Sequence, residues 1–103
     1  MNQCIQHNQT IVPVYVKLAY TCTFNTYIMN TNVSISDFIQ NIKNNVYSDS
    51  TFNISPDTVI QVIQAGQYKQ NSKPEEAEPV LESDEIVGTQ FGKTPAFYIR
   101  LLQ

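Results

Sequence analysis

Histidine and cysteine, the side chains that most often bind metals or act in catalysis, are scarce in this sequence. His7 is the only histidine, and Cys4 and Cys22 are the two cysteines. His7 and Cys4 together supply two ligands, whereas a structural zinc site takes four and a catalytic site three. Neither residue has a partner that the sequence fixes for acid–base or nucleophilic chemistry. We therefore expect no metal, no cofactor and no catalytic set, and we expect two free thiols.

Residues 88–94, Gly-Thr-Gln-Phe-Gly-Lys-Thr, have the composition of a phosphate-binding loop. The Walker pattern needs four residues between its glycines, and only three separate Gly88 from Gly92. A helix must also follow to bind the phosphate, whereas Pro95 follows here. We interpret the segment as a turn before the last strand. Because the carboxylates of residues 75–85 have no base or nucleophile near them, we expect neither an enzyme nor a binder of small-molecule substrates.

The charge pattern excludes one class of partner. The net charge is −3, and the six basic residues are spread along the chain. A nucleic-acid surface needs several Lys or Arg side chains on one face, so we expect no nucleic-acid partner. Six of the nine acidic residues lie in residues 75–85. We interpret this run as a solvated loop, with an electrostatic docking strip as the alternative.

The chain is predicted to form one domain with a short polar extension. A length of 103 residues fits a single core. Residues 1–10 are polar and lack periodicity, which predicts a flexible N-terminal arm, and residues 11–103 are predicted to form the domain. The arm lacks the order of a signal peptide, and no apolar run approaches the roughly 20 residues of a membrane helix. These features favour a cytoplasmic or nuclear protein without direct membrane insertion.

The first part of the domain is predicted to be a β-hairpin. Residues 11–20 alternate with period two, which is typical of a half-buried strand, and one face carries Val12, Val14, Val16 and Leu18. Residues 21–33 are rich in β-branched and aromatic side chains, with Asn25 as a possible turn.

The next segment has helical spacing. Its apolar residues fall at intervals of three and four, and they are Ile35, Phe38, Ile39, Ile42 and Val46. Ser34 can cap the first turn, with Asp37 three residues later, and Val33 can pack against Phe38. We predict an amphipathic helix here, followed by a polar loop.

Three later segments complete the pattern. Residues 55–66 carry both the Ser-Pro-Asp start of a helix and the β-branched run of a strand, so local rules leave the two alternatives open. Residues 80–87 are predicted to contain a short helical turn with Leu81 and Ile86 pointing inward. Residues 96–102 alternate and predict a final apolar strand.

The order of these segments, with three local motifs, resembles the ubiquitin-like family. Residues 14–17, Val-Tyr-Val-Lys, resemble the family's first strand, and residues 36–43, Ser-Asp-Phe-Ile-Gln-Asn-Ile-Lys, resemble the start of its helix. Residues 61–67, Gln-Val-Ile-Gln-Ala-Gly-Gln, are similar to its third strand and following turn. The resemblance covers residues 12–102. It implies an α+β fold, the β-grasp, with a mixed sheet of four to five strands around one central helix, and it favours the strand for residues 59–64.

Residues 65–67 and 71–73 are also similar to the membrane-anchored ubiquitin-fold subfamily. That subfamily carries a prenylated cysteine at its C-terminus, which this sequence lacks. The sequence therefore predicts no lipid anchor. Lys43 matches a linkage lysine of ubiquitin, and we interpret it as an ordinary lysine of the helix surface.

The resemblance implies a contact patch on the outer face of the sheet. The matching positions are Ile63 on the third strand, Tyr98 on the last strand, and Ala19 or Tyr20 in the hairpin. Val59 should share this face if the alternation holds, which adds exposed apolar area of the kind that marks an interaction site. The alternative is that an added loop or a neighbouring chain covers Ile63 and Tyr98.

Ubiquitin is conjugated through a C-terminal Gly-Gly, and this sequence ends Ile-Arg-Leu-Leu-Gln. We therefore expect a non-conjugated interaction module that presents Val59, Ile63 and Tyr98 to a protein partner. One alternative is a structural subunit of a larger assembly. Another is a conjugated modifier that is made as a longer precursor.

Overall fold

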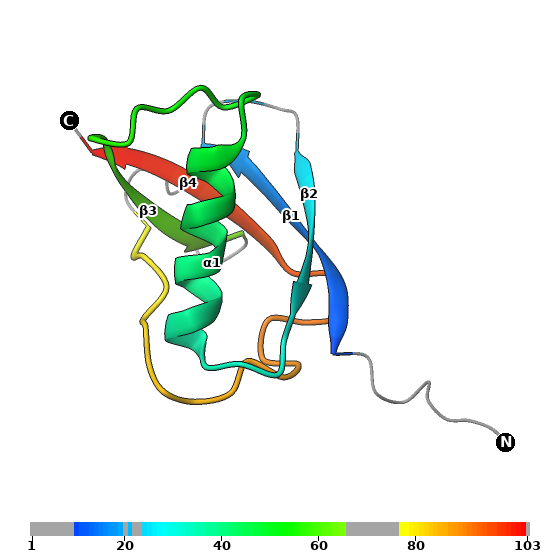
Figure 1. The fold of residues 1–103 in the computed structure, drawn as a ribbon. Coiled ribbons are helices and arrows are strands. Elements are labelled where there is room, and N and C mark those ends of the chain that lie inside the picture. The colour runs from blue at the N-terminus through cyan, green and yellow to red at the C-terminus, as the bar shows by residue number, and fades with distance from the viewer. Residues whose placement is uncertain (1–9, 20, 22–23, 66–76, 103) are drawn as a thin grey trace, which may run out of the picture.

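The described residues form a small α+β fold of one helix and four strands. The computed structural model describes residues 10–19, 21, 24–65 and 77–102. Its elements in chain order are β1 (Ile11–Leu18), β2 (Asn25–Asn30), α1 (Ile35–Ser48), β3 (Val59–Gln64) and β4 (Ala96–Leu102), as Figure 1 shows. The predicted arm, residues 1–10, lies outside the described residues except for Thr10.

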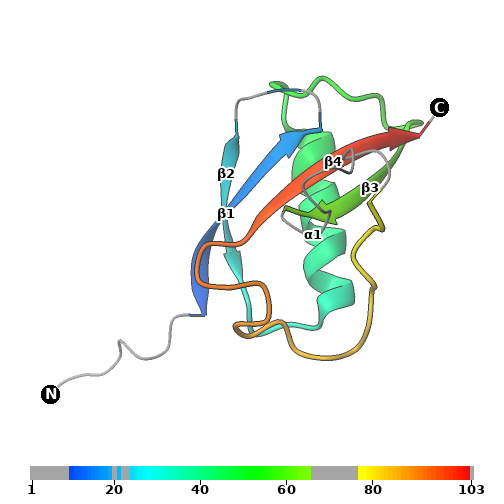
Figure 2. The same ribbon diagram turned by 180° about the vertical axis from the view of Figure 1, so that it is seen from behind.

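The four strands form one mixed sheet in the order β2-β1-β4-β3. The two central strands, β1 and β4, run parallel, with Lys17 opposite Tyr98. Each outer strand is antiparallel to its neighbour, so β2 pairs with β1 and β3 pairs with β4. Figure 2 shows the sheet from the side opposite the helix. The sheet thus has two faces, one covered by α1 and one turned away from it.

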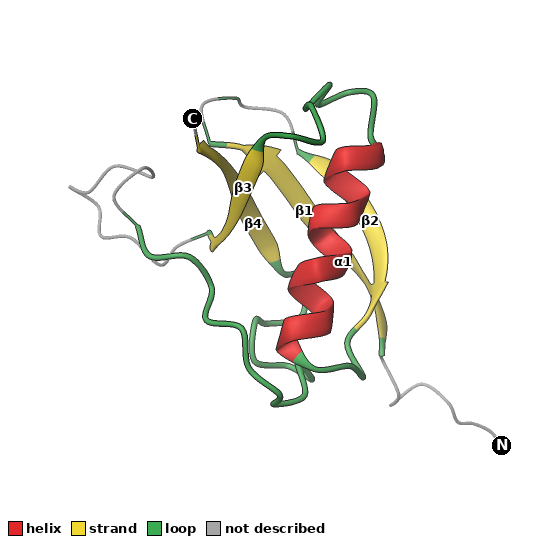
Figure 3. Cartoon of the chain, turned by 60° about the vertical axis from the view of Figure 1, so that its left-hand side comes forward, coloured by secondary structure: helices red, strands yellow, loops and turns green. Residues whose placement is uncertain are grey.

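The core lies between the sheet and α1, which packs across one face (Figure 3). Alternation along β1 directs Val12, Val14 and Val16 toward the helix, as predicted, and all three are buried. The predicted apolar stripe of α1 is buried in full, and it comprises Ile35, Phe38, Ile39, Ile42 and Val46. Helical spacing of three and four places these side chains on one face, which is why a polar helix can cover an apolar sheet.

Both ends of α1 are capped. The side chain of Ser34 accepts a hydrogen bond of 3.1 Å from the amide of Asp37, which confirms the predicted N-cap. The amide of Ile35 donates to the carbonyl of Glu85 at 2.8 Å, so a distant loop satisfies a further free donor of the first turn. At the other end, the amide of Asp49 donates to the carbonyl of Val46.

Residues 77–87, yellow to orange in Figure 1, run along β3 and the start of α1 as an extended segment, which we call the strap. The predicted helical turn in this segment is wrong, and so is the inward orientation of Leu81 and Ile86, which are 83% and 52% exposed. The strap is extended because its backbone bonds to other elements. The amide of Val80 donates to Val62, and the amide of Val87 donates to Val33.

Residues 88–94 form turns before β4, as predicted. Gly88 and Gly92 have φ angles of 51° and 89°, a region that other residues rarely adopt. Between them, Phe91 packs against the core, with its ring centroid 5.4 Å from that of Phe97 and 6.1 Å from that of Phe38. The segment that has the composition of a phosphate loop therefore supplies an aromatic side chain to the core.

Candidate protein-binding face

The candidate surface is the sheet face turned away from α1, which we call the outer face. Because side chains alternate along a strand, the outer face carries Tyr15 and Lys17 from β1, and Tyr98 and Arg100 from β4. The pairing of β3 with β4 places Ile63 opposite Tyr98. The resemblance-based prediction therefore assigns these two residues to the correct face.

Ile63 itself is not exposed. It is 0% accessible, although it does not belong to the core cluster beneath α1. Ala77, at the start of the strap, is also buried outside that cluster. The expectation that Ile63 forms part of an exposed patch is therefore wrong, because the side chain is fully buried.

An arginine fixes the strap at this point. The Arg100 Nε and Nη2 atoms donate to Oε1 of Gln61 at 2.9 and 2.5 Å, and Nη1 donates to the carbonyl oxygen of Ala77 at 2.9 Å. Gln61 lies directly opposite Arg100 in the β3–β4 ladder. One guanidinium on the outer face thus joins two strands and the start of the strap.

The other half of the outer face carries an aromatic cluster. Phe24, in the connection before β2, lies with its ring centroid 6.4 Å from Tyr98 in a stacked arrangement and 6.3 Å from Tyr15 edge-on. The Lys17 Nζ atom lies 4.8 Å from the centroid of Tyr98 and 5.4 Å from that of Phe24. Phe24 remains 40% exposed. We call Tyr15, Lys17, Phe24 and Tyr98 the aromatic platform.

Lys17 is held in place within this platform. Its Nζ atom donates a hydrogen bond of 2.6 Å to the carbonyl of Thr21, in the β1–β2 connection. A cation above two ring faces is attracted by the negative charge of the π-systems. The lysine therefore fixes the hairpin connection against β4 and keeps Phe24 on the outer face.

The remaining predicted site residues do not form one patch. Val59 is 59% exposed, but it lies opposite Leu102 at the far end of β3, four residues from the pair of Ile63 and Tyr98. That separation is about 13 Å along a strand. Ala19 is half-buried, and its amide donates to the carbonyl of Ile99. Tyr20 lies outside the described residues.

Phe24 was not predicted as a site residue. The sequence places it in a β-rich run, but its position over Tyr98 depends on the geometry of the hairpin connection. A hairpin's register is set by its turn, which the sequence leaves open here. The available signal was the aromatic content of residues 15–24 around one lysine, which includes Tyr15, Lys17 and Phe24.

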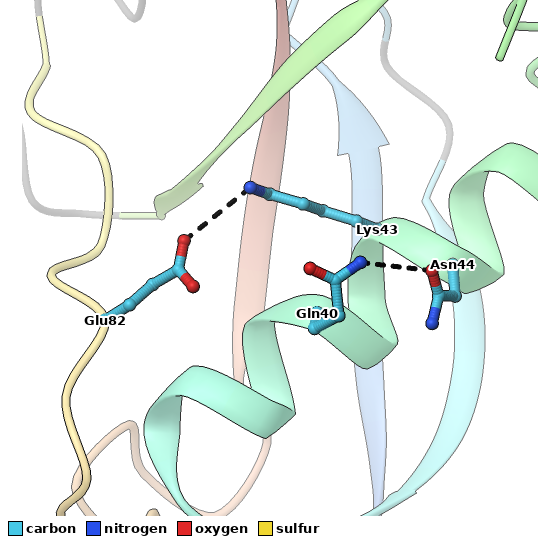
Figure 4. Close-up of polar contacts among 4 residues, drawn as sticks. All are labelled: Gln40, Lys43, Asn44 and Glu82. Atoms are coloured by element: carbon cyan, nitrogen blue, oxygen red, sulfur yellow. Dashed lines mark hydrogen bonds and ion pairs between the residues drawn. The ribbon is translucent and has the colours of Figure 1, made fainter.

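The helix surface provides a contrasting, polar side of the molecule. Lys43 Nζ lies 3.6 Å from Glu82 Oε2 of the strap, and Gln40 donates to Asn44 one turn further along α1 (Figure 4). Both partners of the ion pair are partly exposed, so the pair contributes at most about 1 kcal/mol. This arrangement fits the interpretation of Lys43 as an ordinary lysine of the helix surface.

A tyrosine–aspartate pair joins β2 to the end of α1. Burial, with the hydrogen bond to the Asp49 carboxylate, raises the pKa of Tyr27 well above its usual value. The hydrogen bond from Tyr27, with the backbone amide of Thr51, lowers the pKa of Asp49. Both directions favour the state in which a neutral phenol donates to a carboxylate, which is a structural role.

The described residues contain neither a metal-ligand cluster nor a membrane-spanning helix. Among them, no three His, Cys, Asp or Glu side chains are grouped to hold a metal ion. No helix in that part of the chain has the length and apolar character needed to cross a bilayer. Comparisons with protein-family models, curated proteins and solved structures found no match for this chain.

Proposed function

We propose that the chain is a ubiquitin-like β-grasp domain. The strand order β2-β1-β4-β3, with a parallel central pair between two antiparallel neighbours, supports this assignment. So does the position of α1, which connects the β1–β2 hairpin to β3 across one sheet face (Figure 3). The motif resemblances of residues 14–17 and 36–43 fall on β1 and α1, and residues 61–64 of the third motif fall on β3.

We further propose that the domain is a non-enzymatic module that binds a protein partner through the aromatic platform. One observation carries the proposal: Phe24 is 40% exposed while its ring stacks on Tyr98 and meets Tyr15 edge-on. Aromatic side chains are enriched at the centre of protein interfaces because they bury a large area with few rotatable bonds. The partner would place an apolar side chain against Phe24.

The platform is also preorganised. Lys17 contacts both rings and the Thr21 carbonyl, so Phe24 and Tyr98 are held in one arrangement before a partner arrives. A preorganised surface loses less conformational entropy on binding. Lys17 adds a positive charge, which favours a partner with a carboxylate beside its apolar anchor.

Comparative affinity capture tests this function. The full chain and its Phe24→Ala variant are used as baits in lysate of the source cells, and captured proteins are quantified. The control is Leu81→Ala, which removes a more exposed apolar side chain from the strap. We expect proteins captured by the native chain and by Leu81→Ala to be depleted at least tenfold with Phe24→Ala, whose folding is checked by circular dichroism. Equal capture by all three chains would overturn the proposal.

A further inference from the structure

The two edge strands of the sheet, β3 and β2, differ in the backbone hydrogen bonds on their outer sides. At the β3 edge, the strap supplies a hydrogen bond of 2.8 Å from the Val80 amide to the Val62 carbonyl. At the β2 edge, no backbone hydrogen bond reaches the outer side of the strand from any residue that the structure describes. An uncovered edge strand is a template for pairing with another strand.

The register identifies the peptide groups that point outward from β2. The Thr31 amide donates to the Thr10 carbonyl, so Thr31 and Thr10 form a hydrogen-bonded pair of the β1–β2 ladder. Such pairs recur at every second residue of an antiparallel ladder, so the next one is Met29 with Val12. The Tyr15 amide bonds to Pro95 on the other side of β1, which confirms this alternation independently. The N–H and C=O groups of Thr26, Ile28 and Asn30 therefore point away from the sheet.

The β2 edge also lacks the usual protection against strand pairing. The strand, Asn-Thr-Tyr-Ile-Met-Asn, contains no charged residue, no proline and no glycine. Natural edge strands commonly use such residues, lysine and proline above all, to prevent association. In contrast, the central outward residue here, Ile28, is apolar and 68% exposed.

Space is available beside this edge. A groove of about 230 Å³ lies between the end of β2 and α1. Its helix wall is formed by the uncharged side chains of Asn41, Asn44 and Asn45. A strand added to β2 would therefore pass an uncharged stretch of the helix surface at this groove.

We propose that the β2 edge binds β2 of a second copy of this chain, antiparallel, about a two-fold axis through Ile28. Thr26 and Asn30 lie two residues before and after Ile28, so Thr26 of one copy lies opposite Asn30 of the other. Each outward N–H group of one copy then meets an outward C=O group of the other. The ladder would contain about six backbone hydrogen bonds. The two Ile28 side chains would meet on the outer face at the axis. Because β2 is uncharged, no like charges are brought together, whereas the chain as a whole carries −3.

This self-association uses the free edge of β2 and not the aromatic platform. It creates a C2 dimer in which two four-stranded sheets become continuous. The contact involves one short strand from each copy, so the dimer is small in area and depends on protein concentration.

A charge-pairing experiment tests the dimer. Sedimentation equilibrium is measured on the full chain, on Ile28→Lys, on Ile28→Glu and on an equimolar mixture of these two variants. We expect the native chain to approach twice its monomer mass as concentration rises, and each variant alone to remain monomeric because like charges meet at the axis. The mixture should recover the dimer mass, because a lysine then faces a glutamate. Val59→Lys, a change at an exposed β-branched residue of the other edge, should dimerise as the native chain does.

Amide hydrogen exchange locates the contact. At high concentration we expect the amides of Thr26, Ile28 and Asn30 to exchange at least tenfold more slowly than at low concentration, whereas Tyr27 and Met29 are protected at both. A native chain that stays monomeric at millimolar concentration would overturn the proposal. So would a dimer that Ile28→Lys leaves intact, a mixture that stays monomeric, an equal effect of Val59→Lys, or a dimer in which those three amides are unchanged.

Discussion

The phenolic hydroxyl of Tyr27 donates a hydrogen bond of 2.7 Å to Oδ2 of Asp49, so a side chain of the edge strand β2 holds the residue that ends α1. Asn25, at the start of β2, donates to the same oxygen at 2.6 Å. The other carboxylate oxygen accepts from the amide of Thr51 at 3.0 Å. Asp49 thus joins the strand, the helix end and the following turn through one side chain.

Removing the hydroxyl of Tyr27 should weaken this connection without disturbing packing. Tyr27→Phe keeps the ring against the core and is expected to lower the free energy of unfolding by about 1 kcal/mol, a value reduced by the partial exposure of the pair. Urea denaturation measures the change. In an Asp49→Ala background the same substitution should cost clearly less, because its acceptor is gone; an equal cost in both backgrounds would contradict the coupling.

Acid should weaken the same connection. The hydrogen bond from Tyr27 lowers the pKa of Asp49 in the folded chain, so the unfolded chain binds this proton more readily. The stabilisation is therefore complete above the ordinary carboxyl pKa of about 4 and is lost as pH falls through the lower folded value. We expect the difference in unfolding free energy between the native chain and Asp49→Asn to shrink from pH 6 to pH 2. A difference that stays constant over this range would contradict the proposed dependence of stability on the protonation of Asp49.

Burial of Ile63 on the outer face has a direct energetic consequence. Ile63→Ala should cost about 2 to 4 kcal/mol, as for other fully buried isoleucines. Val59→Ala, on the same strand and face but 59% exposed, should cost less than about 1 kcal/mol. Thermal unfolding of the two variants gives the comparison. Similar small costs at both positions would mean that Ile63 is accessible after all.

The two attachments of the strap should differ in strength. Arg100→Ala removes hydrogen bonds to Gln61 and to the Ala77 carbonyl, and it should accelerate amide exchange at Val80 while leaving the α1 amides unchanged. Lys43→Ala removes only a partly exposed ion pair with Glu82 and is expected to cost less than about 0.5 kcal/mol. If Lys43→Ala released the strap as much as Arg100→Ala, the assigned role of the arginine would be wrong.

Local patterns predicted the elements whose residues depend on near neighbours. The helix at Ile35–Ser48 follows from apolar spacing and the Ser34 cap, and Ala96–Leu102 follows from alternation. The strand at Val59–Gln64 did not follow from local rules, because its Ser-Pro-Asp start also fits a helix. Its β-branched residues pair with β4, almost forty residues away, and only the family resemblance favoured this alternative.

The predictions that failed depend on contacts between distant segments. Leu81 and Ile86 point outward because hydrogen bonds to Val62 and Val33 set the direction of the strap, which its own sequence does not encode. Ile63 is fully buried on the face turned away from α1, which alternation along β3 alone did not predict. The expectation that the chain is not conjugated to other proteins stays a prediction. So does the alternative that the chain is a structural subunit of a larger assembly.

The central claim, that the aromatic platform is a protein-binding surface, is tested most directly by photocrosslinking in the source cells. Phe24 is replaced by a photoreactive benzoyl-phenylalanine, and in a second chain the same residue replaces Leu81, which is the more exposed of the two. We predict a discrete covalent adduct to another protein from position 24 that Tyr98→Ala reduces, and none from position 81. An adduct from position 81 alone, or no adduct from position 24, would contradict the proposed function.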